Sequence, residues 1–253
     1  MRFMILQKLR YLGVFSSLIS LLGQAALVFV GLCTYSLAAI LVHEAGHAVV
    51  GLLFGFEIGA VRVGPADLKR QNKWIWALNK ESWGSGFVRA QFRKVPGPWA
   101  SLRCFLFVMG GPLANLCFAV LLALLSSGDS FFGRVCGYLM LACILFGVGN
   151  LIPFKSKLGL SDGAKLLSII FRPKWREDFV FRLSLKARVA EIIVLSRNHK
   201  LRQAIQESDE LKARFQALTG VNPEATQPLE RMRDAFERAL AAEGASKTET
   251  QAS

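Results

Sequence analysis

Two histidines and a glutamate fall within five residues of an apolar stretch, as His43-Glu44-Ala45-Gly46-His47. On a helix, residues four apart lie on one face, so His43 and His47 can bind one metal ion together. Zinc held by neutral imidazoles lowers the pKa of a bound water towards about 7. Glu44 can take the proton of that water without being a ligand and later pass it to a leaving amine. The pattern predicts a zinc metalloendopeptidase.

A catalytic zinc usually has a third protein ligand, and the chain offers few acids for this position. Glu57 follows the motif too closely to fold back easily onto His47, and Asp129 falls on the other side of the membrane in the expected topology. Asp162, directly after the last apolar stretch, is the best-placed acid. Asp162-Gly163 can equally be a turn or a helix cap, so the ligand and the cap remain alternatives.

The composition indicates a membrane protein. The chain has 253 residues, of which 53% are hydrophobic, and its mean hydropathy is +0.38, which is too apolar for an ordinary soluble domain of this length. One helix over 11–54 would be roughly 65 Å long, about twice the thickness of the hydrocarbon core, so we expect a turn at 31–36. The pattern predicts four membrane spans, near 11–31, 36–55, 104–126 and 131–152.

The positive charges of the chain predict its orientation. The net charge is +13, and the 55–103 loop carries nine Lys and Arg residues against three acids. The first ten residues and the segment after residue 153 are basic as well. Positive loops stay in the cytoplasm, so both termini and this loop are expected there. The expected location is a prokaryotic cell membrane, with the chain as an integral membrane protein. Nucleic-acid binding is not expected, because no recognition module is visible.

Other segments complete an all-α polytopic membrane protein with a small strand-containing loop. Ile58–Val63 and Gly86–Phe92 alternate like short strands. Residues 1–173 form the expected transmembrane core. Residues 174–243 have interleaved charged and apolar residues at helical spacing and predict a helical cytoplasmic domain, either a solvated appendage or a site for a regulatory protein. Residues 244–253 are small and polar, as in disordered tails.

Placing a charged group in the hydrocarbon core of a membrane costs free energy, so such groups usually have partners or a function. An interhelical hydrogen-bonding cluster is the structural alternative for the histidine motif. A proteolytically inactive scaffold or chaperone is the alternative function. A metal-ion transporter would need polar residues on several spans, and the other spans offer almost none besides Asn115.

Three separated segments resemble the site-2 protease family of intramembrane metalloproteases. The first is the His43–His47 motif, and the second is Gly110-Gly111-Pro112-Leu113-Ala114-Asn115, like the GPxxN of that family. The third is Asn150-Leu151-Ile152-Pro153 followed by Asp162-Gly163, like its NxxP and DG. The resemblance covers about residues 36–170. One departure is the stretch between Pro153 and Asp162, where eight residues intervene and the family commonly has fewer.

The resemblance implies one zinc ion per chain, held by His43, His47 and Asp162, with Glu44 as the catalytic base. It also implies that Asn150 and Asn115 hold substrate or support the active-site helices, although a helix–helix hydrogen bond also explains Asn115. The implied activity is hydrolysis of peptide bonds in or near the transmembrane segments of membrane protein substrates. This activity is known as regulated intramembrane proteolysis.

Overall fold

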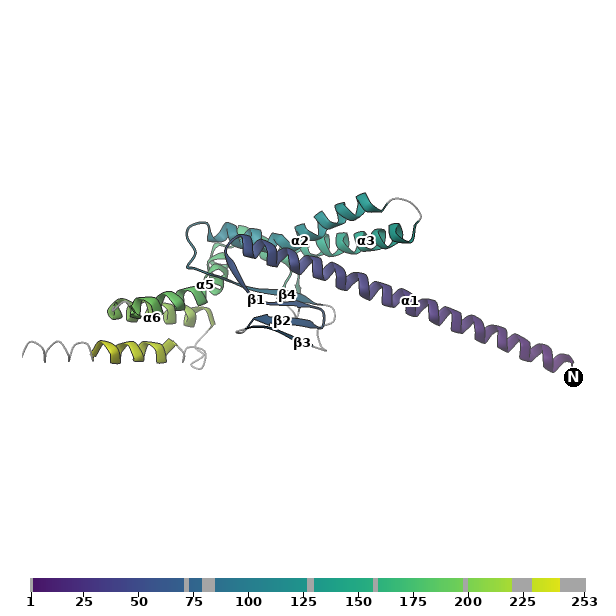
Figure 1. Ribbon diagram of the computed structural model, residues 1–253, viewed down its shortest axis with the longest axis horizontal. Coiled ribbons are helices and arrows are strands. Elements are labelled where there is room, and N and C mark those ends of the chain that lie inside the picture. The colour runs from purple at the N-terminus through teal and green to yellow at the C-terminus, as the bar shows by residue number, and fades with distance from the viewer. Residues whose placement is uncertain are drawn as a thin grey trace, which may run out of the picture.

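Three long helices dominate the protein. A computed structural model describes residues 2–70, 73–78, 85–126, 130–156, 159–197, 200–219 and 229–241, with side chains from residue 20 onward. In Figure 1, α2 and α3 run side by side next to the C-terminal half of α1. The helices are α1 (Arg2–Leu53), α2 (Ala100–Leu125) and α3 (Phe131–Leu151). Each contains a segment long and apolar enough to cross a membrane: Ser20–Leu53, Ala100–Leu125 and Phe131–Leu151.

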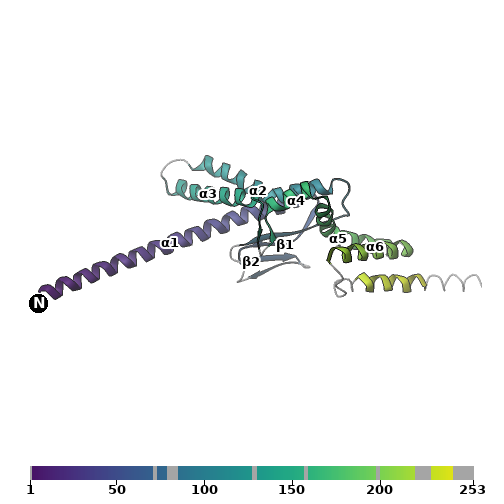
Figure 2. The same cartoon turned by 180° about the vertical axis from the view of Figure 1, so that it is seen from behind.

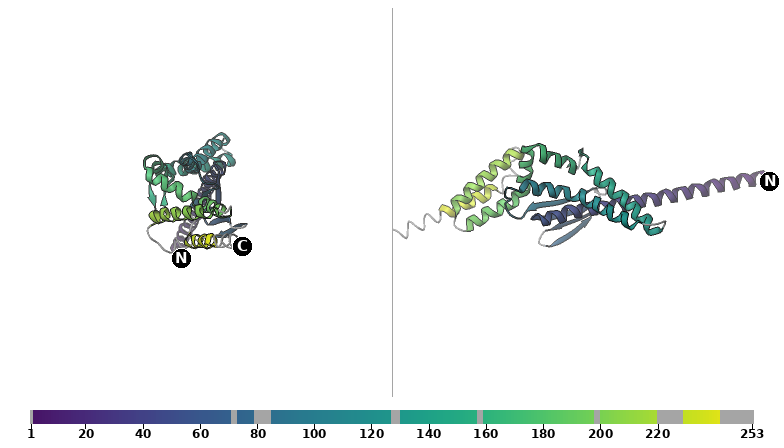
Figure 3. Two further views of the ribbon diagram at one scale, coloured as in Figure 1. Left: turned by 90° about the vertical axis from the view of Figure 1, so that its left-hand side faces the viewer. Right: turned by 90° about the horizontal axis from the view of Figure 1, so that it is seen from above.

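The turn predicted at 31–36 is wrong, because α1 continues through these residues without a break. The segment contains no proline, and its single glycine costs only about 1 kcal/mol in a helix. The Thr34 hydroxyl donates to the Val30 carbonyl at 2.8 Å, so this polar group is satisfied within the helix. The predicted spans near 11–31 and 36–55 are therefore parts of one helix. Its N-terminal half extends well beyond the other elements (Figures 1 and 3).

The loop between α1 and α2 forms an antiparallel sheet in the order β3-β2-β1-β4. The two predicted strands are confirmed, and the structure shows that they pair with each other, with Val61 of β1 opposite Val88 of β4. The other two strands form a hairpin on the far side of β1 that was not predicted. The strands are β1 (Phe56–Val63), β2 (Ala66–Arg70), β3 (Trp74–Leu78) and β4 (Gly86–Phe92).

A buried aromatic cluster attaches this sheet to α2. The rings of Phe56 and Phe92 stack with centroids 4.3 Å apart, and Phe56 stacks on Phe107 of α2 at 5.2 Å. All three side chains are buried, so the apolar face of β1 and β4 is removed from solvent. This packing holds the start of β1 and the end of β4 against α2.

After α3 the chain forms two short strands and then a series of helices. Residues 229–241 are helical too, so helices account for most of the described part of the region predicted as a helical domain. Figure 2 shows α4 beside α2, while α5 and α6 lie at the end of the molecule away from the N-terminus. Residues 244–253, predicted to be disordered, lie outside the described residues. The elements are β5 (Lys155–Ser156), β6 (Gly159–Leu160), α4 (Asp162–Phe171), α5 (Pro173–Arg197) and α6 (Leu201–Thr219).

Candidate metal centre

One turn of α1 presents two imidazoles side by side. His43 and His47 are both buried, and their Nε2 atoms are 3.1 Å apart. The two rings meet edge to face, with centroids 4.7 Å apart. This arrangement follows from the four-residue spacing, which places both side chains on the same face of the helix.

Asp162, the first residue of α4, brings its carboxylate to the two imidazoles of α1. Helix α3 ends before Pro153, which disfavours helical geometry in the preceding residue. Ser161 then caps α4: its hydroxyl accepts from the Ala164 amide at 3.2 Å and donates to the Ile152 carbonyl at 2.8 Å. Since Ser161 is the cap, the alternative of Asp162 as the capping residue does not hold, and its carboxylate is free to face α1.

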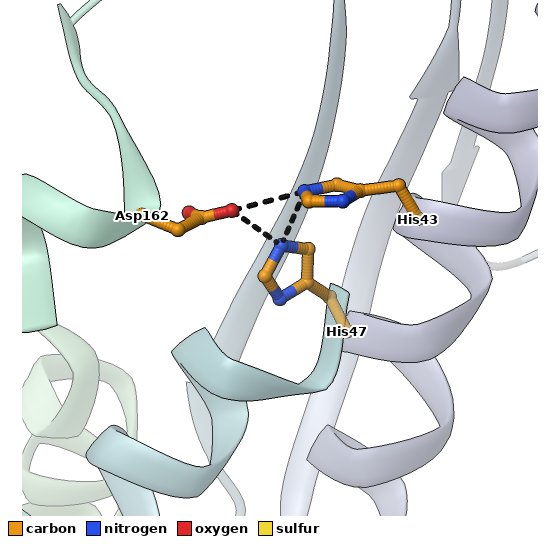
Figure 4. Close-up of side chains that lie close together, drawn as sticks. All are labelled: His43, His47 and Asp162. Atoms are coloured by element: carbon orange, nitrogen blue, oxygen red, sulfur yellow. Dashed lines mark hydrogen bonds and ion pairs between the residues drawn. The ribbon is translucent and has the colours of Figure 1, made fainter. Parts of the chain in front are cut away.

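The Asp162 carboxylate and the two imidazoles converge (Figure 4). Oδ2 of Asp162 lies 2.9 Å from Nε2 of His43 and 3.2 Å from Nε2 of His47. Oδ1 of the same carboxylate lies 2.9 Å from Nζ of Lys165, and this ammonium group favours the ionised form of the carboxyl. The carboxylate is therefore a charged donor at neutral pH.

The outer nitrogen of His47 sets the tautomer of this ring. Its Nδ1 lies 2.8 Å from the Phe107 carbonyl oxygen, which can only accept, so Nδ1 carries the proton. The Gly111 amide lies 3.3 Å from the same nitrogen, but a protonated Nδ1 cannot accept, and the shorter contact decides. The lone pair of His47 is then on Nε2, which faces the cluster.

Asn115 occupies the corresponding place beside His43. Its side-chain nitrogen is 3.4 Å from Nδ1 of His43, and its Oδ1 is buried without a hydrogen-bond partner among the described residues. Turning the amide group over would place Oδ1 opposite Nδ1 and give both atoms a partner. His43 would then have its proton on Nδ1 and its lone pair on Nε2, like His47.

The three residues fit a metal ion. The three donor atoms lie within 4.8 Å of one another, and two lone pairs facing a carboxylate oxygen need a positive charge between them. A tetrahedral zinc ion separates its ligand atoms by about 3.3 Å, close to the spacing of these three atoms. The space is also kept open, because a Cβ at Gly111 would collide with Nε2 of His47 and lie 2.7 Å from Nε2 of His43.

Glu44 lies beside this group without belonging to it. Its side chain is buried and lines the same cavity as the two histidines. The start of β4 packs directly on it, since a Cβ at Gly86 would collide with the Glu44 carboxylate. The Glu44 side chain thus projects from α1 against the start of β4. Its carboxylate can act as a base next to the three metal-binding side chains.

A cavity of about 1050 Å³ opens over the centre. Its walls include residues of α1, α2, β4, the end of α3, α4 and α5, and α5 contributes Phe179 and Leu183. Asn150 lines the cavity too, and its side-chain amide donates to the Phe146 carbonyl of its own helix at 3.0 Å. The structure therefore places Asn115 against a histidine and Asn150 in the cavity wall.

Sequence reasoning missed three contributors to this site and gave a fourth, Gly111, only as part of a motif. Lys165, whose Nζ is 2.9 Å from Oδ1 of Asp162, was detectable from its spacing of three residues on a helix. Gly86 and Gly111 act by having no side chain, and the Phe107 carbonyl belongs to the backbone. The type of a residue does not indicate what its backbone carbonyl contacts. Only the folded structure could therefore reveal the role of the Phe107 carbonyl.

No protein-family model matches this chain, and no curated protein or solved structure gives a match. A function must therefore be argued from the site itself.

Proposed function

We propose that this chain is an intramembrane zinc metalloprotease of the site-2 protease type. The observation that carries the proposal is the buried convergence of His43, His47 and Asp162, with Glu44 beside them, on helices apolar enough to lie in a bilayer. Buried ionisable groups in such helices usually mark a functional site. One zinc ion per chain would be held by the two Nε2 atoms and Oδ2 of Asp162.

Each side chain has a separate role in this proposal. When bound, zinc supplies Lewis-acid activation of water for attack on a peptide carbonyl. Glu44 accepts a proton from the attacking water and returns it to the leaving amine. The Phe107 carbonyl and Asn115 keep the proton of each imidazole on Nδ1, which leaves both Nε2 atoms free to donate.

The substrate must be unwound before it can be cut, because a transmembrane helix hides its carbonyls in hydrogen bonds. Strand β4 supports a way of holding the unwound segment. Among the described residues it pairs only with β1, and it begins at Gly86, next to Glu44. An extended segment of a membrane protein substrate could add to this edge as a further strand, with its scissile bond beside the base. In this proposal, α5 and α6 are the helices to which a regulatory protein would bind.

Mass spectrometry of membrane proteins tests this function in cells. Cells that carry the intact protein would be compared with cells that carry Glu44→Gln. We expect at least one membrane protein to accumulate uncut in the variant, and its fragments in the parent to end in or beside a transmembrane segment. If neither strain yields such a fragment, the inactive scaffold becomes the better interpretation.

A further inference from the structure

The two carboxylate oxygens of Asp162 have different neighbours. Oδ2 faces the two histidine nitrogens at 2.9 and 3.2 Å. Oδ1 is 2.9 Å from Nζ of Lys165, the residue three positions further along α4. The carboxylate is therefore divided, with one oxygen for the metal group and one for an ammonium group.

This ion pair differs from an ordinary pair on a helix surface. Exposed pairs contribute little because water competes for both charges. Asp162 is only 5% exposed, and Lys165 lines the cavity over the centre. Helix α4 is held by its Ser161 cap and by the buried side chains of Leu166 and Ile169. The same short helix thus fixes the backbone positions of both residues, and the side chain of Lys165 is 35% exposed.

A free second oxygen would matter at such a site. A carboxylate can bind a metal through one oxygen or through both, and the second mode would raise a centre of three protein ligands and one water from four-coordinate to five-coordinate. Charge-assisted hydrogen bonds are short and strong enough to hold the second oxygen away from the metal.

We propose that Lys165 is a positioning residue that restricts Asp162 to one-oxygen ligation and so keeps the metal four-coordinate, with its fourth position for water. The inference rests on the proposed metal site and extends it to a residue that does not contact the metal. Lys165 acts through Asp162, and its ammonium group has no part in the proton transfers assigned to Glu44.

Cobalt(II) substitution of the full-length protein in detergent tests this role. Four-coordinate Co²⁺ absorbs visible light far more strongly than five-coordinate Co²⁺, so the spectrum reports the coordination number. We expect the intact protein to show the intense bands. Lys165→Met should lose most of this intensity while still binding one ion, and Lys165→Arg should restore it. X-ray absorption of the zinc-loaded Lys165→Met variant should show one additional oxygen neighbour.

Lys186→Met is the matched control. Lys186 also pairs with a carboxylate, that of Glu57 at 2.8 Å, but this pair lies outside the metal group. Its spectrum should equal that of the intact protein. An unchanged spectrum in Lys165→Met would overturn the inference, as would failure of both Lys165→Met and Lys165→Gln to fold, because a purely structural role would then suffice. If the intact protein binds no ion, or binds it equally well after His43→Ala, the proposed metal site itself is wrong.

Discussion

Glu44 and His43 are adjacent in the chain, but their proposed roles predict different losses. Glu44→Gln keeps nearly the same shape and cannot accept a proton at neutral pH. We expect it to retain zinc and to lower the cleavage rate by at least about 10²–10⁴-fold. His43→Ala removes a ligand and should lose zinc as well as cleavage. The measurement is cleavage of a membrane protein substrate in liposomes, with zinc counted in the same samples. Cleavage at the parent rate by Glu44→Gln would show that another group is the base.

The two asparagines are expected to differ in a similar way. Asn115 contacts Nδ1 of His43, whereas Asn150 lies in the cavity wall. Removal of a partner that orients a histidine ligand typically costs about 10–100-fold in metal affinity, so Asn115→Ala should weaken zinc binding by that factor. Asn150→Ala should leave zinc affinity unchanged and reduce substrate cleavage. Competition with a chromophoric chelator measures the affinity, and equal zinc affinities in the two variants would contradict this assignment.

At the scale of elements, one helix contact brings the site together. A Cβ at Gly46 would collide with the Gly110 carbonyl oxygen and the Ala114 side chain, so α1 and α2 touch backbone to backbone at this point. Gly46→Ala should push the helices apart and lower both zinc retention and the melting temperature. Gly23→Ala is the control on the same helix, because a Cβ there meets nothing within 4 Å. A melting temperature as high in Gly46→Ala as in Gly23→Ala would contradict this packing.

The sequence predicted an element correctly where its apolar residues recur at regular spacing or where a residue such as proline ends it. The helices after residue 99 and the strands β1 and β4 follow from apolar runs, alternation and the break at Pro153. The turn at 31–36 was inferred from length alone, and no residue there ends a helix. Strand β2 has the polar sequence Ala66–Arg70 and shows little alternation, whereas the apolar run Trp74–Leu78 of β3 did carry a strand signal.

The sequence was enough to predict which residues form the site. It was not enough to predict how their side chains are arranged. The spacing of His43 and His47 fixes a shared helix face, so their proximity follows from sequence. For Asp162 the sequence left two alternatives, because both a ligand and a cap are compatible with a short polar residue before a helix. Ser161 resolves this through hydrogen bonds to residues on both sides of the short β5–β6 hairpin. Such contacts depend on how the chain folds back and leave no local pattern.

At the scale of the whole molecule, the continuous α1 changes the expected topology. If each of the three apolar helices crosses the membrane once, the two termini lie on opposite sides, unlike the common side predicted from charge. The 55–103 loop has nine basic residues and the first ten residues have three, so the loop should determine the orientation. The apolar part of α1 has 34 residues and a length of about 51 Å, so it must tilt or protrude from the bilayer.

Reporter fusions at each end check this arrangement. With α1 crossing once, a fusion after residue 241 should be cytoplasmic and one before residue 2 external. A fusion within the 55–103 loop serves as the control and should report the cytoplasm. A cytoplasmic N-terminal reporter would mean that α1 does not cross as one straight helix in the membrane, which would restore the original prediction for the termini.

The three donor atoms of the centre come from residues far apart in the chain, with His43 and His47 lying 119 and 115 residues before Asp162. During synthesis, a chain that has grown only as far as α2 already contains both imidazoles but no third ligand. The centre can be completed only after α3 has been inserted and α4 has folded back onto α1. The proposed protease would therefore stay inactive throughout its own insertion, and its activity would begin only when membrane integration is finished.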